Sequence, residues 1–133
     1  MNYVKLFIGG AERGAKLGIG FLEKVMKGED ISLQTLFNKI EVEAFTFLPK
    51  LLYYALAYNC ERAGEKVDFD LNDVFDWTDE IGINSEEFLR FQVAFYNSIK
   101  THLPQESQES INAAVKEIEG KMKPQTKSGK TGK

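Results

Sequence analysis

The sequence predicts one mainly α-helical domain with a short β-hairpin at its N-terminus. Three observations lead to this fold class. The run Leu51–Tyr58 has no charged residue, several other segments repeat apolar residues at intervals of three and four, and only residues 3–17 have the character of strands. A chain of 133 residues, 43% of them hydrophobic, can bury a core of its own without disulfides or metal ions.

A central buried helix over about residues 48–63 is the element around which we expect the rest to pack. A helix that is apolar on every side is stable in water only when other elements surround it. Pro49 fits the first turn of this helix, and Gly64 fits the position just past its end. The run is shorter than the roughly 20 apolar residues that span a bilayer, so we expect no contact with a membrane.

The N-terminal hairpin is predicted from residues 3–8, which are rich in β-branched and aromatic side chains, and from the Gly9-Gly10 turn signal that follows. Residues 11–17 would form the returning strand, although Gly14 and two alanines weaken it. A lone hairpin is marginally stable, so it must pack on the helices or pair with another chain.

Two shorter helices are expected before the central one. Residues 21–26 have helical spacing, and Gly28 is the predicted end of that helix. Ser32 can cap a helix over 33–40, with Asp30 as a competing cap. Residues 41–47 are ambiguous, and either continue into the central helix or form a kinked link.

Three helices are expected after it. Asp70 caps a helix over 71–81, and Asn84 or Ser85 caps a long helix that Pro104 closes. A last helix over 106–122 carries a narrow apolar stripe, which either closes the domain core or docks on another chain. We therefore expect a packed domain over 1–123. The lysine- and glycine-rich residues 124–133 contain no hydrophobic residue, and should form a disordered tail.

From the charged and chemically reactive residues we expect a protein that has no cofactor, binds no metal ion and has no catalytic activity. The net charge of −3 argues against binding to nucleic acid, and Cys60 and His102, the one cysteine and the one histidine, lie too far apart in sequence to predict a zinc site. The acidic run 68–73 resembles the start of a calcium loop, but Asp73 stands where such a loop needs glycine. No recognisable catalytic set is present, so we do not expect an enzyme.

Short apolar motifs occur along the chain in the same order as in a known protein family. They are Ile8-Gly9-Gly10-Ala11-Glu12, Leu17-Gly18-Ile19-Gly20-Phe21-Leu22, Leu51-Leu52-Tyr53-Tyr54-Ala55-Leu56, Gly64-Glu65-Lys66-Val67 and Leu71-Asn72-Asp73-Val74-Phe75-Asp76-Trp77. In this order the chain resembles the tail assembly chaperones of long-tailed bacteriophages and prophages, over roughly residues 3–103. It departs from the family pattern at Arg13-Gly14-Ala15, where a bulkier alternation is usual.

The resemblance implies a function and partners. Such chaperones bind the long helical tape measure protein and keep it soluble in the cytoplasm of the bacterial host, and several of them form homo-oligomers. The alternative is a structural head–tail or tail adaptor subunit that stays in the particle. We expect the partner-binding residues to come from the last two helices: Phe88, Phe91, Phe95, Ile111, Val115 and Ile118.

Overall fold

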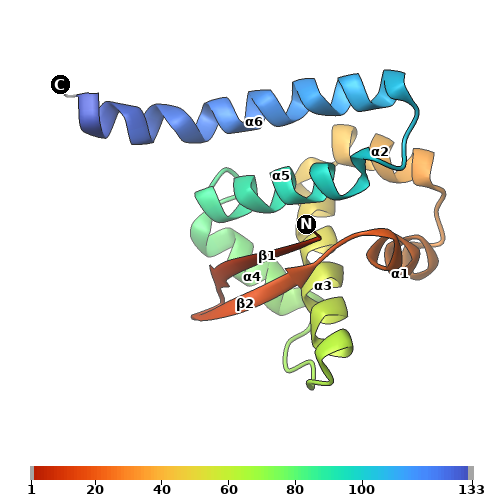
Figure 1. Ribbon diagram of the computed structural model, residues 1–133. Coiled ribbons are helices and arrows are strands. Elements are labelled where there is room, and N and C mark those ends of the chain that lie inside the picture. The colour runs from red at the N-terminus through yellow and green to blue at the C-terminus, as the bar shows by residue number, and fades with distance from the viewer. Residues whose placement is uncertain (1, 132–133) are drawn as a thin grey trace.

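The computed structural model describes the backbone of residues 2–131 and the side chains of residues 2–122. Within this part the chain forms a two-stranded hairpin and six helices, which confirms the predicted fold class (Figure 1). The elements are β1 (Tyr3–Ile8), β2 (Ala11–Lys16), α1 (Ile19–Glu29), α2 (Leu33–Val42), α3 (Ala44–Ala63), α4 (Leu71–Ile81), α5 (Glu86–Lys100) and α6 (Gln105–Thr131).

The hairpin is antiparallel and is closed by two glycines. Gly9 and Gly10 have φ values of 67° and 77°, and such positive values match the turn that best follows the twist of two short strands. Because side chains alternate along β1, Leu6 and Ile8 are buried while Phe7, between them, is 59% exposed. The hairpin packs with β2 against α3 and with β1 against α5.

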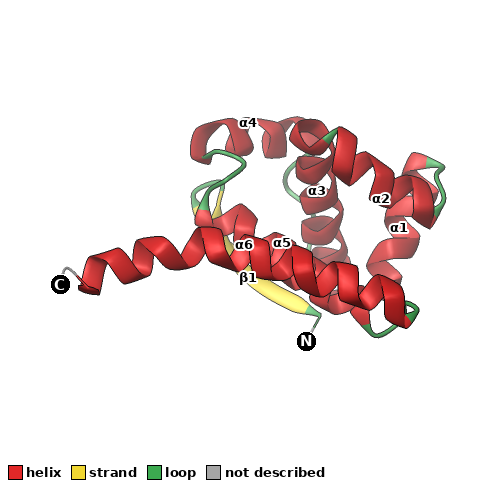
Figure 2. Cartoon of the chain, turned by 90° about the horizontal axis from the view of Figure 1, so that it is seen from above, coloured by secondary structure: helices red, strands yellow, loops and turns green. Residues whose placement is uncertain are grey.

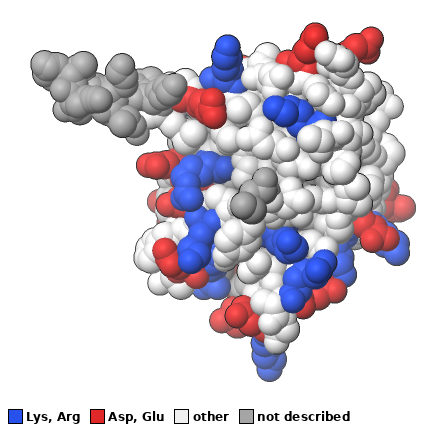
Figure 3. Space-filling model, in the orientation of Figure 1, with Lys and Arg blue, Asp and Glu red and all other residues white. Residues whose placement is uncertain are grey.

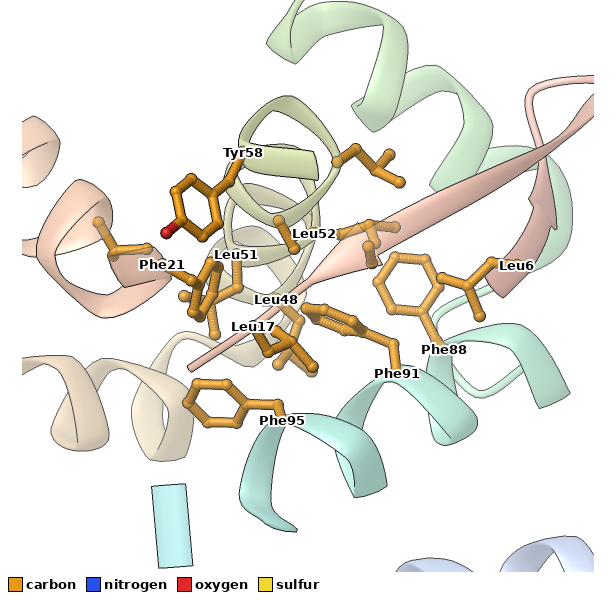
Figure 4. Close-up of a cluster of buried hydrophobic side chains, with 14 of the residues drawn as sticks. Leu6, Leu17, Phe21, Leu48, Leu51, Leu52, Tyr58, Phe88, Phe91 and Phe95 are labelled. Atoms are coloured by element: carbon orange, nitrogen blue, oxygen red, sulfur yellow. The ribbon is translucent and has the colours of Figure 1, made fainter. Parts of the chain in front are cut away.

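Helix α3 lies at the centre of the molecule, as predicted. In Figure 2, α1 and α2 lie on one side of α3 and α4 on the other, and the hairpin turn reaches Trp77 of α4. Its residues Leu51, Leu52 and Ala55 are fully buried. Figure 4 shows apolar side chains from the hairpin, α1, α3 and α5 meeting in one cluster, with the aromatic row of α5 at its edge.

Two predicted helix boundaries are wrong. The central helix begins at Ala44 rather than near residue 48, so Pro49 lies inside α3 instead of in its first turn. The link between α2 and α3 is a kink at Glu43, whose φ and ψ are −131° and 40°. Pro49 has no N–H to donate to the carbonyl of Phe45, so α3 lacks one backbone hydrogen bond at this point, and the buried Pro49 packs within the domain instead.

The other boundary error concerns Gly28, which does not end the first helix. Helix α1 continues to Glu29, and Asp30 adopts the left-handed conformation, with a φ of 58°, that ends it. Gly28 lies instead against the hydroxyl group of Tyr54, where a Cβ atom would have no room. Its lack of a side chain therefore serves the packing of α1 on α3.

Side chains cap the other helices largely as predicted. The hydroxyl oxygens of Ser32 and Ser85 accept hydrogen bonds from the backbone three residues ahead, so Asp30 and Asn84 are not the caps. Asp70 accepts from the Asp73 N–H at 2.9 Å, and Asp73 accepts from the Asp70 N–H at 3.0 Å. This capping box gives the Asp73 carboxylate a structural role.

Helix α6 lies along α5 on the side away from the hairpin (Figure 1). Its bounds, Gln105–Thr131, are wider than the predicted 106–122. The prediction of a tail over 124–133 stays a prediction, because the side chains of 123–133 and the backbone of 132–133 lie outside the described residues.

Charged side chains of both signs are spread over the surface. Figure 3 shows them on the face seen in Figure 1, with wide uncharged areas between them. Among the described helices, none has both the length and the apolar character that crossing a membrane requires.

Candidate functional site

A cleft with mainly apolar walls lies between α2, α5 and α6, and has a volume of about 320 Å³. Its apolar walls come from Phe37, Ile40, Tyr96, Leu103, Ile111 and Ala114. Glu41, Ser107 and Ser110 supply the polar groups of the lining. A concave apolar surface with a few polar groups is typical of a binding site.

A second apolar cleft, of about 530 Å³, lies between α1, the beginning of α2 and the end of α5. Its apolar walls come from Ile19, Leu22, Met26, Leu33, Ile99 and Leu103. Glu23 and His102 are its polar lining residues. Because Leu103 lines both clefts, the two meet at this residue, and together they are called the Leu103 groove below.

The turn that carries Leu103 is held by hydrogen bonds. The Leu103 N–H donates to the carbonyl of Lys100 at 3.2 Å, and the Gln108 side chain donates to the Leu103 carbonyl at 2.9 Å. Lys100 also donates to the side-chain oxygen of Asn112 at 2.9 Å, which ties α5 to α6. These bonds fix the turn that places Leu103 at both clefts.

Tyr96 places a phenol in the α2–α5–α6 cleft. Burial raises the pKa of Tyr96, and the nearby Glu41 carboxylate raises this pKa further. The phenol therefore stays neutral at physiological pH and can donate a hydrogen bond to a ligand. The cleft combines an apolar wall, neutral hydroxyl groups and one carboxylate. This lining suits the apolar side chains of a peptide, and the carboxylate would repel an anion.

The six predicted partner-binding residues are all buried in this chain: Phe88, Phe91, Phe95, Ile111, Val115 and Ile118. The phenylalanines of α5 face the core, where Phe95 meets Phe21 edge-to-face with ring centroids 6.0 Å apart. The stripe of α6 packs on its own domain, and of the six only Ile111 lines the Leu103 groove. Contact of these residues with a partner stays a prediction.

Sequence reasoning missed most residues of the groove. Phe37 and Ile40 were recognisable as the apolar stripe of a helix, but a stripe gives no sign of whether one of its edges stays open to solvent. Leu103 lies in a turn, where no periodic pattern marks it. The groove depends on how far α6 covers α5 and α2, which is a tertiary property.

A separate polar cavity of about 220 Å³ lies between β2, the end of α3 and the link to α4. Arg13 lies at this cavity and is held by the Asp68 carboxylate at 3.7 Å and by the Ile8 carbonyl at 2.9 Å. Burial raises the pKa of the Cys60 thiol, and the carboxylates of Glu65 and Asp68 add to this effect. A protonated thiol is a poor nucleophile, so the arrangement does not activate Cys60 for catalysis.

The described residues offer no group of three or more histidine, cysteine or acidic side chains placed to hold a metal ion. His102 is exposed, follows the end of α5 and lines the Leu103 groove with apolar neighbours. Comparison of the chain with protein-family models, with curated proteins and with solved structures gives no match.

Proposed function

We propose that this chain is a binding protein without catalytic activity, which holds an amphipathic helix of a client protein in the Leu103 groove. One observation carries the proposal: Leu103 lines two apolar clefts, whose other walls come from α1, α2, α5 and α6. An amphipathic helix fills such a groove with apolar side chains at spacings of three and four. This chemistry fits the phage tail assembly chaperones that the sequence resembles, whose client is the tape measure protein.

The polar residues of the groove support this reading. Glu23 lines the cleft beside α1, and the cleft between α2, α5 and α6 has three polar lining residues: Glu41, Ser107 and Ser110. Polar groups around an apolar floor keep an empty groove soluble and set the orientation of a helix bound there. In the chaperone role, the chain would act in the cytoplasm of the bacterial host.

We further propose that several copies act together. A tape measure protein is much longer than the groove of one domain, so one copy covers only a short stretch of it. Homo-oligomerisation would place several grooves along the client. Light scattering on the purified protein, alone and with client, measures this directly.

Co-expression with the tape measure protein of the same phage tests the proposed function. Ala114 lines the groove, whereas its neighbour Ala113 is exposed on another side of α6. Ala114→Glu puts a charge into the groove and should abolish co-purification of the client, while Ala113→Glu should leave it intact. Equal capture by both variants, with unchanged circular dichroism spectra, would contradict the proposal.

The particle itself distinguishes a chaperone from an adaptor. A chaperone leaves the finished tail, whereas a head–tail or tail adaptor subunit remains in it. Mass spectrometry of purified particles should therefore detect no stoichiometric amount of this chain. Its presence at a fixed copy number would favour the adaptor.

A further inference from the structure

A third apolar cleft, outside the Leu103 groove, lies between the first half of α3 and α4. It has a volume of about 350 Å³ and is lined by Phe45, Thr46, Pro49, Phe75, Thr78 and Asp79. None of these residues lines the Leu103 groove. This third cleft is called the Phe45 cleft below.

The apolar surface beside this cleft is unusually open. Phe45 is 78% exposed and Val42, three residues before it, is 68% exposed. They are the two most exposed of the large hydrophobic side chains in the described part of the chain. Single exposed hydrophobic residues are common, but Phe45 also lines the cleft, so its exposed ring would lose contact with water when a ligand binds there.

The rim of the Phe45 cleft is acidic and has no counter-charge. Asp79 lines the cleft, and two further exposed acids lie beside it on α4: Asp76, three residues before it, and Glu80, the next residue. None of these three carboxylates takes part in an ion pair among the described residues. From Val67 to Leu89 the sequence has no lysine or arginine. The groups that surround this cleft therefore leave a negative charge unmatched.

We propose that the Phe45 cleft docks a basic amphipathic segment of another protein. An apolar side chain of that segment would enter between Phe45 and Phe75. Lysines or arginines beside it would pair with Asp76, Asp79 and Glu80. Charge complementarity decides the occupant, because an acidic or neutral segment would leave three carboxylates desolvated next to one another. An anionic membrane surface is disfavoured by the same charges.

A synthetic helical peptide with leucines on one face and lysines on the other is the probe. Phe45→Gln removes the exposed ring, and Phe7→Gln, an exposed phenylalanine on the hairpin, is the matched control. Fluorescence anisotropy should give a dissociation constant that rises at least about tenfold with Phe45→Gln and stays the same with Phe7→Gln. Both residues are exposed, so neither change should alter the melting temperature. Equal affinity for both variants would overturn the proposal.

The charge part of the proposal is tested separately. The double variant Asp79→Asn/Glu80→Gln should weaken binding and flatten its dependence on salt, whereas Glu117→Gln/Glu119→Gln on α6 should do neither. The same peptide with glutamates in place of lysines should not bind. Equal binding of both peptides would overturn the proposal.

Two further measurements exclude other occupants of the Phe45 cleft. Light scattering that shows a dimer lost on Phe45→Gln would overturn the proposal, because a second copy would then cover the cleft. Ala114→Glu should leave peptide binding here unchanged, which separates this inference from the proposed function.

Discussion

The phenol oxygen of Tyr54 on α3 lies against the backbone of Gly28 on α1, where any side chain would begin. Tyr58, one turn further along α3, lies over Gly20 in the same way. The Tyr54 hydroxyl donates to Glu29 at 2.8 Å, and Lys50 donates to the same carboxylate at 3.1 Å. The two glycines therefore let α1 approach α3, and α1 forms one wall of the Leu103 groove.

Gly28→Ala should destabilise the protein although alanine is the better helix former. The added Cβ would overlap the Tyr54 hydroxyl, which its bond to Glu29 holds in place. Overpacking of this kind costs about 1–3 kcal/mol, against a gain of up to about 1 kcal/mol from helix propensity. Urea unfolding should show a net loss of roughly 1 kcal/mol.

Two variants control this prediction. Gly120 lies in α6 with nothing within 4 Å of the added atom, so Gly120→Ala should be neutral or stabilising. Tyr54→Phe removes the overlapping oxygen and should recover part of the loss when it is combined with Gly28→Ala. An equal effect of the two glycine substitutions would rule out the close contact.

Glu29 should make stability depend on pH. Burial alone would raise the pKa of Glu29, but hydrogen bonds from Tyr54 and Lys50 outweigh it and hold this pKa below the ordinary value of 4.5. A carboxyl group whose pKa is lower in the folded state stabilises the protein at pH values above its ordinary pKa. This stabilisation is lost as the pH falls through the folded-state pKa.

Glu29→Gln should therefore cost roughly 1–3 kcal/mol at about pH 7, the usual range for hydrogen bonds to a charged group. The difference between wild type and variant should shrink at a second, lower pH, because the carboxylate becomes protonated as the pH falls through its lowered folded-state pKa. Urea unfolding at the two pH values measures it. A difference that does not change with pH would exclude the ionised carboxylate as its cause.

Arg90 should protect the outer edge of the hairpin. Its guanidinium donates to the Lys5 carbonyl at 2.8 Å, and Glu87, its ion-pair partner on α5, accepts from the Phe7 N–H at 3.2 Å. These side chains bond to backbone groups that a further strand would otherwise use. Arg90→Ala should cost roughly 1–3 kcal/mol and increase aggregation, measured by urea unfolding and static light scattering.

The exposed pair between Lys5 and Glu12, with charged atoms 3.9 Å apart, is the control for Arg90. Glu12→Gln should change stability by less than about 0.5 kcal/mol, because exposed ion pairs contribute little. If the two variants lose the same stability, the bonds to the strand edge are not the cause.

Arg13 should hold the hairpin turn against α4. Its guanidinium carbon lies 4.5 Å from the ring centre of Trp77 and 5.5 Å from that of Phe69. Lysine cannot reproduce this planar stacking, so Arg13→Lys should cost roughly 1–2 kcal/mol. Trp77 is the only tryptophan, and its fluorescence emission should shift in the folded variant. Unchanged emission and stability would contradict the stacked arrangement.

The sequence allowed the fold to be predicted because strong local signals coincide with it. The apolar run Leu51–Tyr58, the Gly9-Gly10 turn and the caps at Ser32 and Asp70 each act within a few residues, and each has the expected role. The start of α3 was missed because tertiary packing tolerates Pro49 inside a helix, which local propensity disfavours.

The candidate site was predictable only in part. The strongest apolar row in the second half of the sequence is formed by Phe88, Phe91 and Phe95. Strong apolar periodicity, however, marks a face that packs in the core as readily as a face that binds a partner. Leu103 and Phe45 carry no such signal, because their exposure depends on which neighbouring helices leave them open. Ile111, one of the residues expected to bind a partner, lines the Leu103 groove, and its contact with a partner stays a prediction.

Hydrogen exchange measured by mass spectrometry, on the chain alone and with the proposed tape measure client, tests the central claim most directly. We predict slower amide exchange in residues 33–42 and 99–114, which border the Leu103 groove, and no change in 3–16. Protection confined to α4, or no protection anywhere in the presence of excess client, would contradict a client helix held in the Leu103 groove.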